Sequence, residues 1–379
     1  MSAMHTTPPQ TRLCLAQRGT GLIELMISIA IGLVIVAAMI ALFVNINRTN
    51  SEMAKANSQI ENGRFAIQLL EIDMMHAGFW GTHTPQFDDL TLTTPPTDVP
   101  SEIPNPCLTY GVNWTSAHKN NLIGIPLQTY DTVSDCSSLI TNKLASSDIL
   151  VVRHAETCVP STGSCAADSS GKLYFQSSLC STVTTPYILD TSGYTLLNRN
   201  CTTGAEKRKF ISNLYYIRNY SVTAGDGIPT LMRSEFDLAS STLSHQPAQP
   251  LIEGIEGFRV ELGIDNISDT GNAVNYTAAI NWTDPTNLTS PSNRGDGIPD
   301  GPFIRCTAAT PCTAAQLSNV VAAKLYVLAR SKEPSPGYTD TKTYQLGSTT
   351  LGPYNDNFKR HVFSTTLRLA SIAARRETP

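Results

Sequence analysis

The sequence predicts an α+β protein in which one long N-terminal helix precedes a head of antiparallel strands with long, disulfide-bearing loops. Three observations support this fold class: an apolar and then amphipathic run from 20 to 77, strand-like runs separated by turn-rich segments, and eight cysteines in the loop-rich part. At 379 residues the chain can form one large domain or two modest ones. Charged residues make up 15% of the chain and the net charge is -4, which disfavours a nucleic-acid partner.

The first element is an apolar segment from Leu22 to Val44 whose only charged residue is Glu24. About 20 apolar residues suffice for a helix to cross the hydrocarbon core of a bilayer. Arg12 and Arg18 precede the segment, and positive charge tends to stay on the cytoplasmic side. We therefore expect a transmembrane helix over 22–44, with all later residues outside the cytoplasm.

The helical pattern continues beyond the membrane segment. Apolar or small residues recur in two series, each with a spacing of seven and the two offset by three, at Ile46, Met53, Ile60, Ile67 and Met74 and at Thr49, Ala56, Gly63, Leu70 and Ala77. No proline interrupts residues 20–76, so we expect one helix over 20–77, about 58 residues and roughly 85 Å long. Gly78 and Gly81 should end it. The small residues favour packing onto a sheet over a free coiled coil.

The head, residues 78–379, alternates between turns and strands. Residues 82–147 are turn-rich and are expected to be mainly loop. Strand-like runs follow at 148–154, 209–222, 229–236, 254–265, 320–331 and 359–371. The run at 320–331 is assigned as a strand, although its pattern also fits a helix.

Eight cysteines after residue 100 favour disulfides and an oxidising compartment. A metal site would need closely spaced Cys or His pairs, and the sequence has none. Eight cysteines permit about 105 pairings, so spacing alone leaves the connectivity open. Pairing of sequence neighbours would join Cys107 to Cys136, Cys158 to Cys165, Cys180 to Cys201, and Cys306 to Cys312.

The leader "MSAMHTTPPQTRLCLAQRG" followed by "TGLIEL" resembles the class III signal of type IV prepilins and pseudopilins. The resemblance implies removal of residues 1–19, cleavage between Gly19 and Thr20 by a prepilin peptidase, and N-methylation of Thr20. It makes Glu24 the fifth mature residue, where a carboxylate meets the N-terminal amine of a neighbouring subunit during assembly. Most members carry Phe where this chain has Thr20.

Head segments such as "LYYIRNYSV", "PLIEGIEGFRVELGID" and "FSTTLRLAS" resemble the PilW family of minor pilins. This resemblance implies a pilin fold and a subunit that primes assembly of a type IV pilus and sits at or near its tip. Adhesion, twitching motility and DNA uptake would be downstream roles. The implied partners are other minor pilins, the major pilin, a tip adhesin, the prepilin peptidase and the inner-membrane assembly platform. The precursor would sit in the inner membrane of a Gram-negative bacterium with its head in the periplasm, and the assembled subunit would be extracellular.

Residues 82–205 match little of this family and are interpreted as a possible insertion. Two alternative functions remain open at this point. A minor pseudopilin of a type II secretion system shares the leader and helix, and a membrane-anchored periplasmic enzyme or binding protein shares only the anchor. No catalytic motif such as GxSxG, HExxH, a P-loop or a dinucleotide fingerprint is present, so we expect no enzyme activity.

The motif "GDGIP" occurs at 225–229 and again at 295–299. Gly-Asp-Gly is strong turn chemistry, and the first copy is expected to close a hairpin between two strands. Around the second copy, Asn293, Asp296 and Asp300 offer oxygen ligands of the kind that Ca²⁺ prefers. Asp265 or Asp269 could complete such a site. A turn without metal is the favoured interpretation, and no other cofactor is expected.

Overall fold

The computed structural model describes residues 21–132 and 136–377. The predicted processing junction between Gly19 and Thr20 lies outside these residues. The chain divides into two compact units, Met1–Ala54 and Lys55–Pro379, and the helix α1 (Leu22–Met75) contributes to both.

In the first unit, residues 22–54 of α1 form the predicted helix. The apolar side chains from Leu22 to Val44 are exposed, because a single helix cannot bury its own surface. Among the described residues, α1 is the one helix long and apolar enough to cross a membrane. Its apolar window lies in the segment that the sequence predicts as transmembrane.

In the second unit, α1 ends at Met75 and the chain turns at Gly78, as the glycines predict. Gly78 has a φ of +75°, a backbone conformation that side chains with a Cβ rarely adopt. Its amide donates to the carbonyl of Arg153 at 3.0 Å, which ties the end of the helix to a strand. A Cβ at this position would also lie 2.8 Å from the Ile372 side chain.

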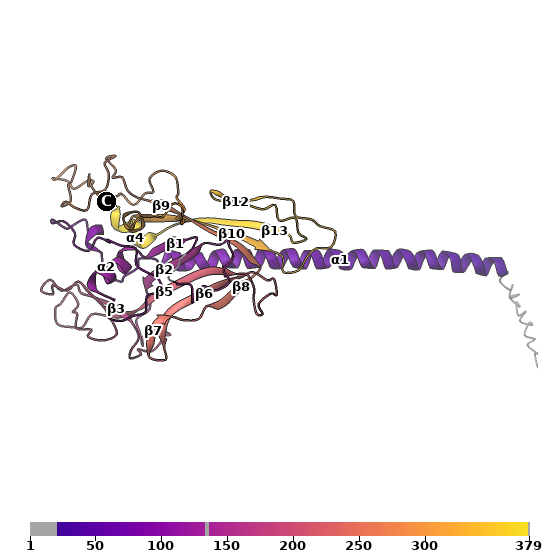
Figure 1. Ribbon diagram of the computed structural model, residues 1–379, viewed down its shortest axis with the longest axis horizontal. Coiled ribbons are helices and arrows are strands. Elements are labelled where there is room, and N and C mark those ends of the chain that lie inside the picture. The colour runs from indigo at the N-terminus through magenta and orange to yellow at the C-terminus, as the bar shows by residue number, and fades with distance from the viewer. Residues whose placement is uncertain (1–20, 133–135, 378–379) are drawn as a thin grey trace, which may run out of the picture. The chain divides into compact units, whose positions relative to one another are not determined.

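An eight-stranded antiparallel sheet forms one layer of the head (Figure 1). Its strands are β1 (Leu127–Tyr130), β2 (Ile149–Ala155), β3 (Tyr174–Ser177), β4 (Tyr187–Asp190), β5 (Lys207–Arg218), β6 (Thr230–Ala239), β7 (Thr242–His245) and β8 (Gln249–Glu253). Their main path is β1-β2-β5-β3-β4, and β6 pairs with β5, β7 and β8. The long strand β5 therefore joins β2, β3 and β6 into one sheet.

A three-stranded antiparallel sheet in the order β13-β10-β9 forms the second layer. The remaining strands are β9 (Ile255–Ile264), β10 (Val320–Arg330) and β13 (Arg360–Arg368), with a small hairpin of β11 (Tyr344–Leu346) and β12 (Thr349–Leu351). Short helices complete the head: η1 (Gln86–Asp88), α2 (Ser116–Gly124), α3 (Ala314–Ser318) and α4 (Ala370–Arg376). The assignment of 320–331 as a strand is confirmed.

The main core lies where residues 55–75 of α1 meet both sheets (Figure 1). Ala66, Leu70 and Met74 of α1 are fully buried there. They share one cluster with Tyr215 of β5 and Val327 of β10. The small residues of the helix thus pack onto sheets, as the sequence predicts.

One sequence prediction about the head is confirmed and another is wrong at its end. Residues 82–147 are mainly loop and turn, as predicted, although they also contain α2 and β1, and the side chain of Thr115 caps α2 by accepting from the amide of His118. The run 359–371 is not strand throughout, because β13 ends at Arg368 and α4 follows. Tertiary contacts of α4 outweigh the strand-like pattern there.

The first "GDGIP" copy closes the hairpin between β5 and β6, as predicted. Asp226 accepts hydrogen bonds from the amides of Ser221, Val222, Thr223 and Ile228. These bonds hold the pKa of Asp226 at about 2, below its usual range. The carboxylate therefore stays charged and organises the turn.

Candidate functional site

Glu24 lies in the first turn of α1, in the membrane-length apolar segment. The backbone carbonyl of Glu24 accepts the hydroxyl of Ser28 at 2.8 Å. A carboxylate within such a segment is costly, which makes Glu24 a candidate functional residue. The expected cleavage and methylation at Gly19 and Thr20 fall outside the described residues.

The second half of α1 is fixed to the head by polar side chains as well as apolar ones. Gln59 is 7% exposed and donates to the carbonyls of Ala329 at 2.7 Å and Lys359 at 3.1 Å. Asn62 donates to the carbonyl of Glu253 at 3.0 Å. Each of these bonds satisfies a carbonyl at the end of a strand.

The buried face of α1 differs from the predicted one. Met53 and Ile60 of the predicted series are 58% and 39% exposed, whereas Gln59 and Ala66, which lie outside that series, are buried. Gly63, Leu70 and other members of the predicted series are buried as expected. A straight helix has 3.6 residues per turn, so a strict spacing of seven drifts around its surface.

Asp73, near the end of α1, makes more side-chain hydrogen bonds to the head than Gln59 or Asn62 does. Its carboxylate accepts from His154 Nε2 at 3.1 Å, Asn213 Nδ2 at 3.0 Å and the Tyr215 hydroxyl at 2.8 Å. Burial, and secondly the charge of Asp73, raises the pKa of Tyr215. Tyr215 therefore remains a phenol that can donate, and Asp73 joins α1 to β2 and β5.

Four disulfides lie in the head, and all eight candidate cysteines take part in them. They join Cys107 to Cys136, Cys158 to Cys165, Cys180 to Cys201, and Cys306 to Cys312. This connectivity coincides with the pairing of sequence neighbours. Each disulfide closes a short loop, so it stiffens a local segment of the head.

The second "GDGIP" copy forms a turn that is hydrogen-bonded to other segments of the head, including the carboxylate of Asp265, which accepts from the amides of Asp296 and Gly297. Asp296 accepts from the amide of Ile298, and Asp300 accepts from the amides of Asn266 and Ile267. The Asn293 side chain accepts from the amide of Asn281 and donates to the carbonyl of Ala279. In the part of the chain that the structure describes, no group of three or more His, Cys, Asp or Glu side chains is placed to hold a metal ion. These contacts favour a turn over a calcium site.

Two features of the head were not found from the sequence. One is the cluster around Asp73, whose members come from three distant segments. The other is a polar groove over β5, lined in part by Thr141, Arg218 and Ser244. Neither feature has a signal in the sequence. The residues of each are spread over the chain and form no motif.

Comparison with known proteins gives one family match. Residues 214–371, from β5 to the start of α4 and less than half of the chain, match the family described as type IV pilus-assembly protein W (PilW). A type IV-like pilin from Thermus thermophilus is a similar solved structure, with 11% sequence identity and a TM-score of 0.32. That match covers 83% of this chain and 96% of the other. No curated protein matches the chain.

Proposed function

We propose, from the match of residues 214–371 to the PilW family, that this chain is a pilin of that family, that it initiates assembly of a type IV pilus and that it becomes part of the fibre at or near its tip. Pilins are structural subunits, so the proposal involves no catalysis by the chain. Adhesion, twitching motility and DNA uptake would follow from the fibre as a whole.

The observation that supports this proposal is that one helix, α1, has an apolar half of membrane length and a second half that packs in the head. Residues 22–44 of α1 are apolar with a single acid, Glu24, and residues 55–75 are built into the core of the head. A subunit of this construction can be held in a membrane by the first half and carry its head outside.

We assign the prepilin peptidase cut to the bond between Gly19 and Thr20, followed by methylation of Thr20. The new N-terminal amine of a neighbouring subunit would then pair with Glu24. Two opposite charges in an apolar environment must meet, because either one alone is strongly disfavoured. The pair would set the axial register of one helix against the next.

The apolar half of α1 dictates how the subunit leaves the membrane. Exposure of some twenty apolar side chains to water would cost roughly 2 kcal/mol for each. The helix therefore has to pass directly from lipid into a bundle of neighbouring helices. Other minor pilins, the major pilin and a tip adhesin are the proposed neighbours, and an inner-membrane platform would drive the transfer in a Gram-negative cell.

Mass spectrometry of the mature protein tests the processing step. The expected N-terminus is N-methylated Thr20. A mature chain that retains residues 1–19 would indicate a plain membrane anchor and contradict the proposal.

The assembly step is tested by Glu24→Ala, with Glu61→Ala as the matched control. Glu61 lies on the exposed side of the same helix, in the half that packs on the head. We expect Glu24→Ala to reduce recovery of the subunit in sheared pili by about tenfold or more, since an amine without its partner destabilises the bundle. Glu61→Ala should be recovered at the wild-type level. Normal incorporation of the Glu24→Ala protein would rule out the proposed pairing.

A further inference from the structure

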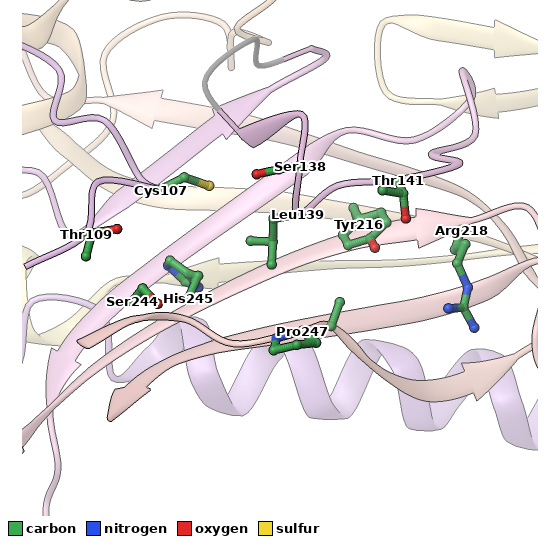
Figure 2. Close-up of a pocket in the computed structure, with 11 residues that line it drawn as sticks. Cys107, Thr109, Ser138, Leu139, Thr141, Tyr216, Arg218, Ser244, His245 and Pro247 are labelled. Carbon is green, nitrogen blue, oxygen red and sulfur yellow. The ribbon is translucent and has the colours of Figure 1, made fainter. Parts of the chain in front are cut away.

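A polar groove lies on the face of the eight-stranded sheet opposite to α1. Side chains alternate between the two faces along β5. Tyr215 and Ile217 belong to the core with α1, whereas Leu214 and Tyr216 belong to a separate cluster on the other face. The groove, about 510 Å³, lies over this second face (Figure 2). Because α1 packs on the opposite face of the sheet, it does not cover the groove within the subunit.

The walls of the groove are held in place by covalent and backbone bonds. Cys107 on one wall is joined to Cys136, which precedes the other wall, with a Cα–Cα distance of 5.4 Å. The amide of Tyr110 donates to the carbonyl of Leu243 at 2.9 Å, and the amide of Asn219 donates to that of Asn142 at 2.9 Å. The groove is thus preformed, which lowers the entropic cost of binding.

Hydroxyl groups line the groove along its length. Thr109 and Ser244 lie near one end, Ser138 lies on the disulfide-linked wall, and Thr141 lies towards the other end (Figure 2). Within the described residues, the side chains of these four make no hydrogen bond to another protein group. Each can donate one hydrogen bond and accept others. The groove therefore offers an array of neutral donors and acceptors.

Arg218 supplies a positive charge at the end of the groove beyond Thr141 (Figure 2). Its Nε donates to the carbonyl of Tyr220 at 3.0 Å, its Nη2 donates to that of Ser221, and its guanidinium lies 4.0 Å from the centre of the Tyr220 ring. No carboxylate among the described residues lies within ion-pair distance of it, and no acidic residue lines the groove. Arg218 is thus held in one orientation, with Nη1 available to an acceptor.

We propose that this groove binds a carboxylate-bearing saccharide, with the acid on Arg218 and sugar hydroxyls on the lining Thr and Ser side chains. The volume is in the range of ligand sites, about 300–1,000 Å³. A nucleic-acid strand fits less well, because it requires several cations to neutralise its phosphates and the lining has one. The site concerns ligand binding by the isolated subunit and does not depend on the proposed assembly role.

The test measures binding of defined sugars to the full-length chain in detergent micelles, by saturation-transfer NMR and calorimetry. The acidic probes are sialyllactose, a hyaluronan tetrasaccharide and trigalacturonate, and the neutral counterparts are lactose and chitotetraose. At least one acidic probe should bind while its neutral counterpart does not. Arg218→Gln should weaken that binding about 10- to 100-fold, since it removes a charge-assisted hydrogen bond. Arg199→Gln, at an exposed position outside the groove, should leave it unchanged.

A second variant guards against a folding effect of Arg218→Gln, which loses two bonds to the turn after β5. Ser138→Trp adds bulk at an exposed position on the groove wall and should block binding without lowering the melting temperature. Equal affinity for acidic and neutral sugars, binding of a thymidine oligonucleotide in place of sugars, or no binding to any probe would each overturn the proposal. Wild-type affinity in Ser138→Trp would also overturn it.

Discussion

His154 illustrates how a single residue in a strand gains a role from the fold. Its Nδ1 faces the carbonyl of Ala155 at 2.9 Å and its Nε2 faces the carboxylate of Asp73 at 3.1 Å. The sequence shows a histidine in a strand, and only the packing of α1 on β2 shows its partner. The contact joins α1 to β2 at one place only, so it helps to specify the position of the helix.

Gly63 of α1 is required by close packing against β13. A Cβ at this position would lie 2.2 Å from the nearest atom of the Phe363 ring. Glycine inside a helix normally costs about 1 kcal/mol relative to alanine, so its presence here indicates a steric need. The small residue is predictable from the heptad pattern, but the ring it contacts is not.

Gly63→Leu should lower the free energy of unfolding of the head by about 1–3 kcal/mol, because the added side chain overpacks this contact. Adding Phe363→Ala to the same chain should restore part of that loss. Urea unfolding of the full-length protein in micelles, followed by the fluorescence of the buried Trp80 and Trp114, measures both effects. If the losses of the two single variants simply add in the double variant, the contact does not determine the residue.

At the scale of elements, α4 shows why the chain departs from its local pattern. Arg376 is 2% exposed, and its guanidinium bonds to Asp88 at 2.8 Å, to Asp265 at 3.2 Å and to the carbonyl of Ser318 at 2.9 Å. Arg375 also bonds to Asp88, at 2.9 Å. These charges hold α4 against η1 and the end of β9. These ion pairs outweigh the local strand propensity of residues 369–371, so the chain forms α4 there.

Arg376→Ala should destabilise the head by about 3–5 kcal/mol, because it leaves the buried carboxylate of Asp265 without its ion-pair partner and that of Asp88 with Arg375 alone. Arg368→Ala is the matched control, since Arg368 is close in sequence and pairs with Glu377 at the surface, where both side chains are about half exposed. A surface pair contributes about 0–1 kcal/mol. Thermal unfolding of the two variants checks the contrast, and similar melting temperatures would contradict it.

At the scale of the whole molecule, residues 82–205 are part of the main architecture of the head. They contribute α2 and the strands β1 to β4. Strand β2 pairs with β5 in a register that places Leu150 opposite Tyr215 and Ala155 opposite Phe210. The family match begins only at 214. If this region is an insertion, it has been built into the same sheet, where it also supplies two walls of the groove.

Partly buried histidines make the stability of the whole head depend on pH. Burial, with nearby arginines second, lowers the pKa of His83 and His118 to about 4 and that of His245 to about 3. In the unfolded chain these groups titrate near 6.5, so protons bind the unfolded state first as the pH falls. The free energy of unfolding should therefore decrease from about pH 6.5 towards pH 4.5. Asp98, whose pKa burial raises to about 6, acts in the opposite direction over part of this range.

His118→Gln tests this dependence, because it removes one of the three titrating groups. One group contributes a slope of at most about 1.4 kcal/mol per pH unit. Urea unfolding at pH 7.5, 6.5 and 5.5 should show a shallower loss of stability for the variant than for the wild type. Equal slopes would show that His118 is not held neutral by burial.

The sequence by itself determined the features that depend on local pattern. These features are the apolar run with its single Glu24, the stop at Gly78, the strand-like run of β9 and the turn chemistry of "GDGIP", all of which depend on residues near in sequence. The sequence predicted disulfides but left their connectivity open, and the structure shows that each cysteine pairs with its neighbour in the sequence.

Only the tertiary structure decided the features whose partners are distant in the chain. The salt bridges of α4 join Asp88 and Asp265 to Arg376. The hydrogen-bonding partners of Asp73 are His154, Asn213 and Tyr215. The groove brings together hydroxyl groups from four segments of the chain. Strand pairing and helix docking bring such groups together, and neither spacing nor composition records which strand pairs with which. Contacts at long sequence separation are a property of the folded chain, so they could not be predicted from the order of its residues.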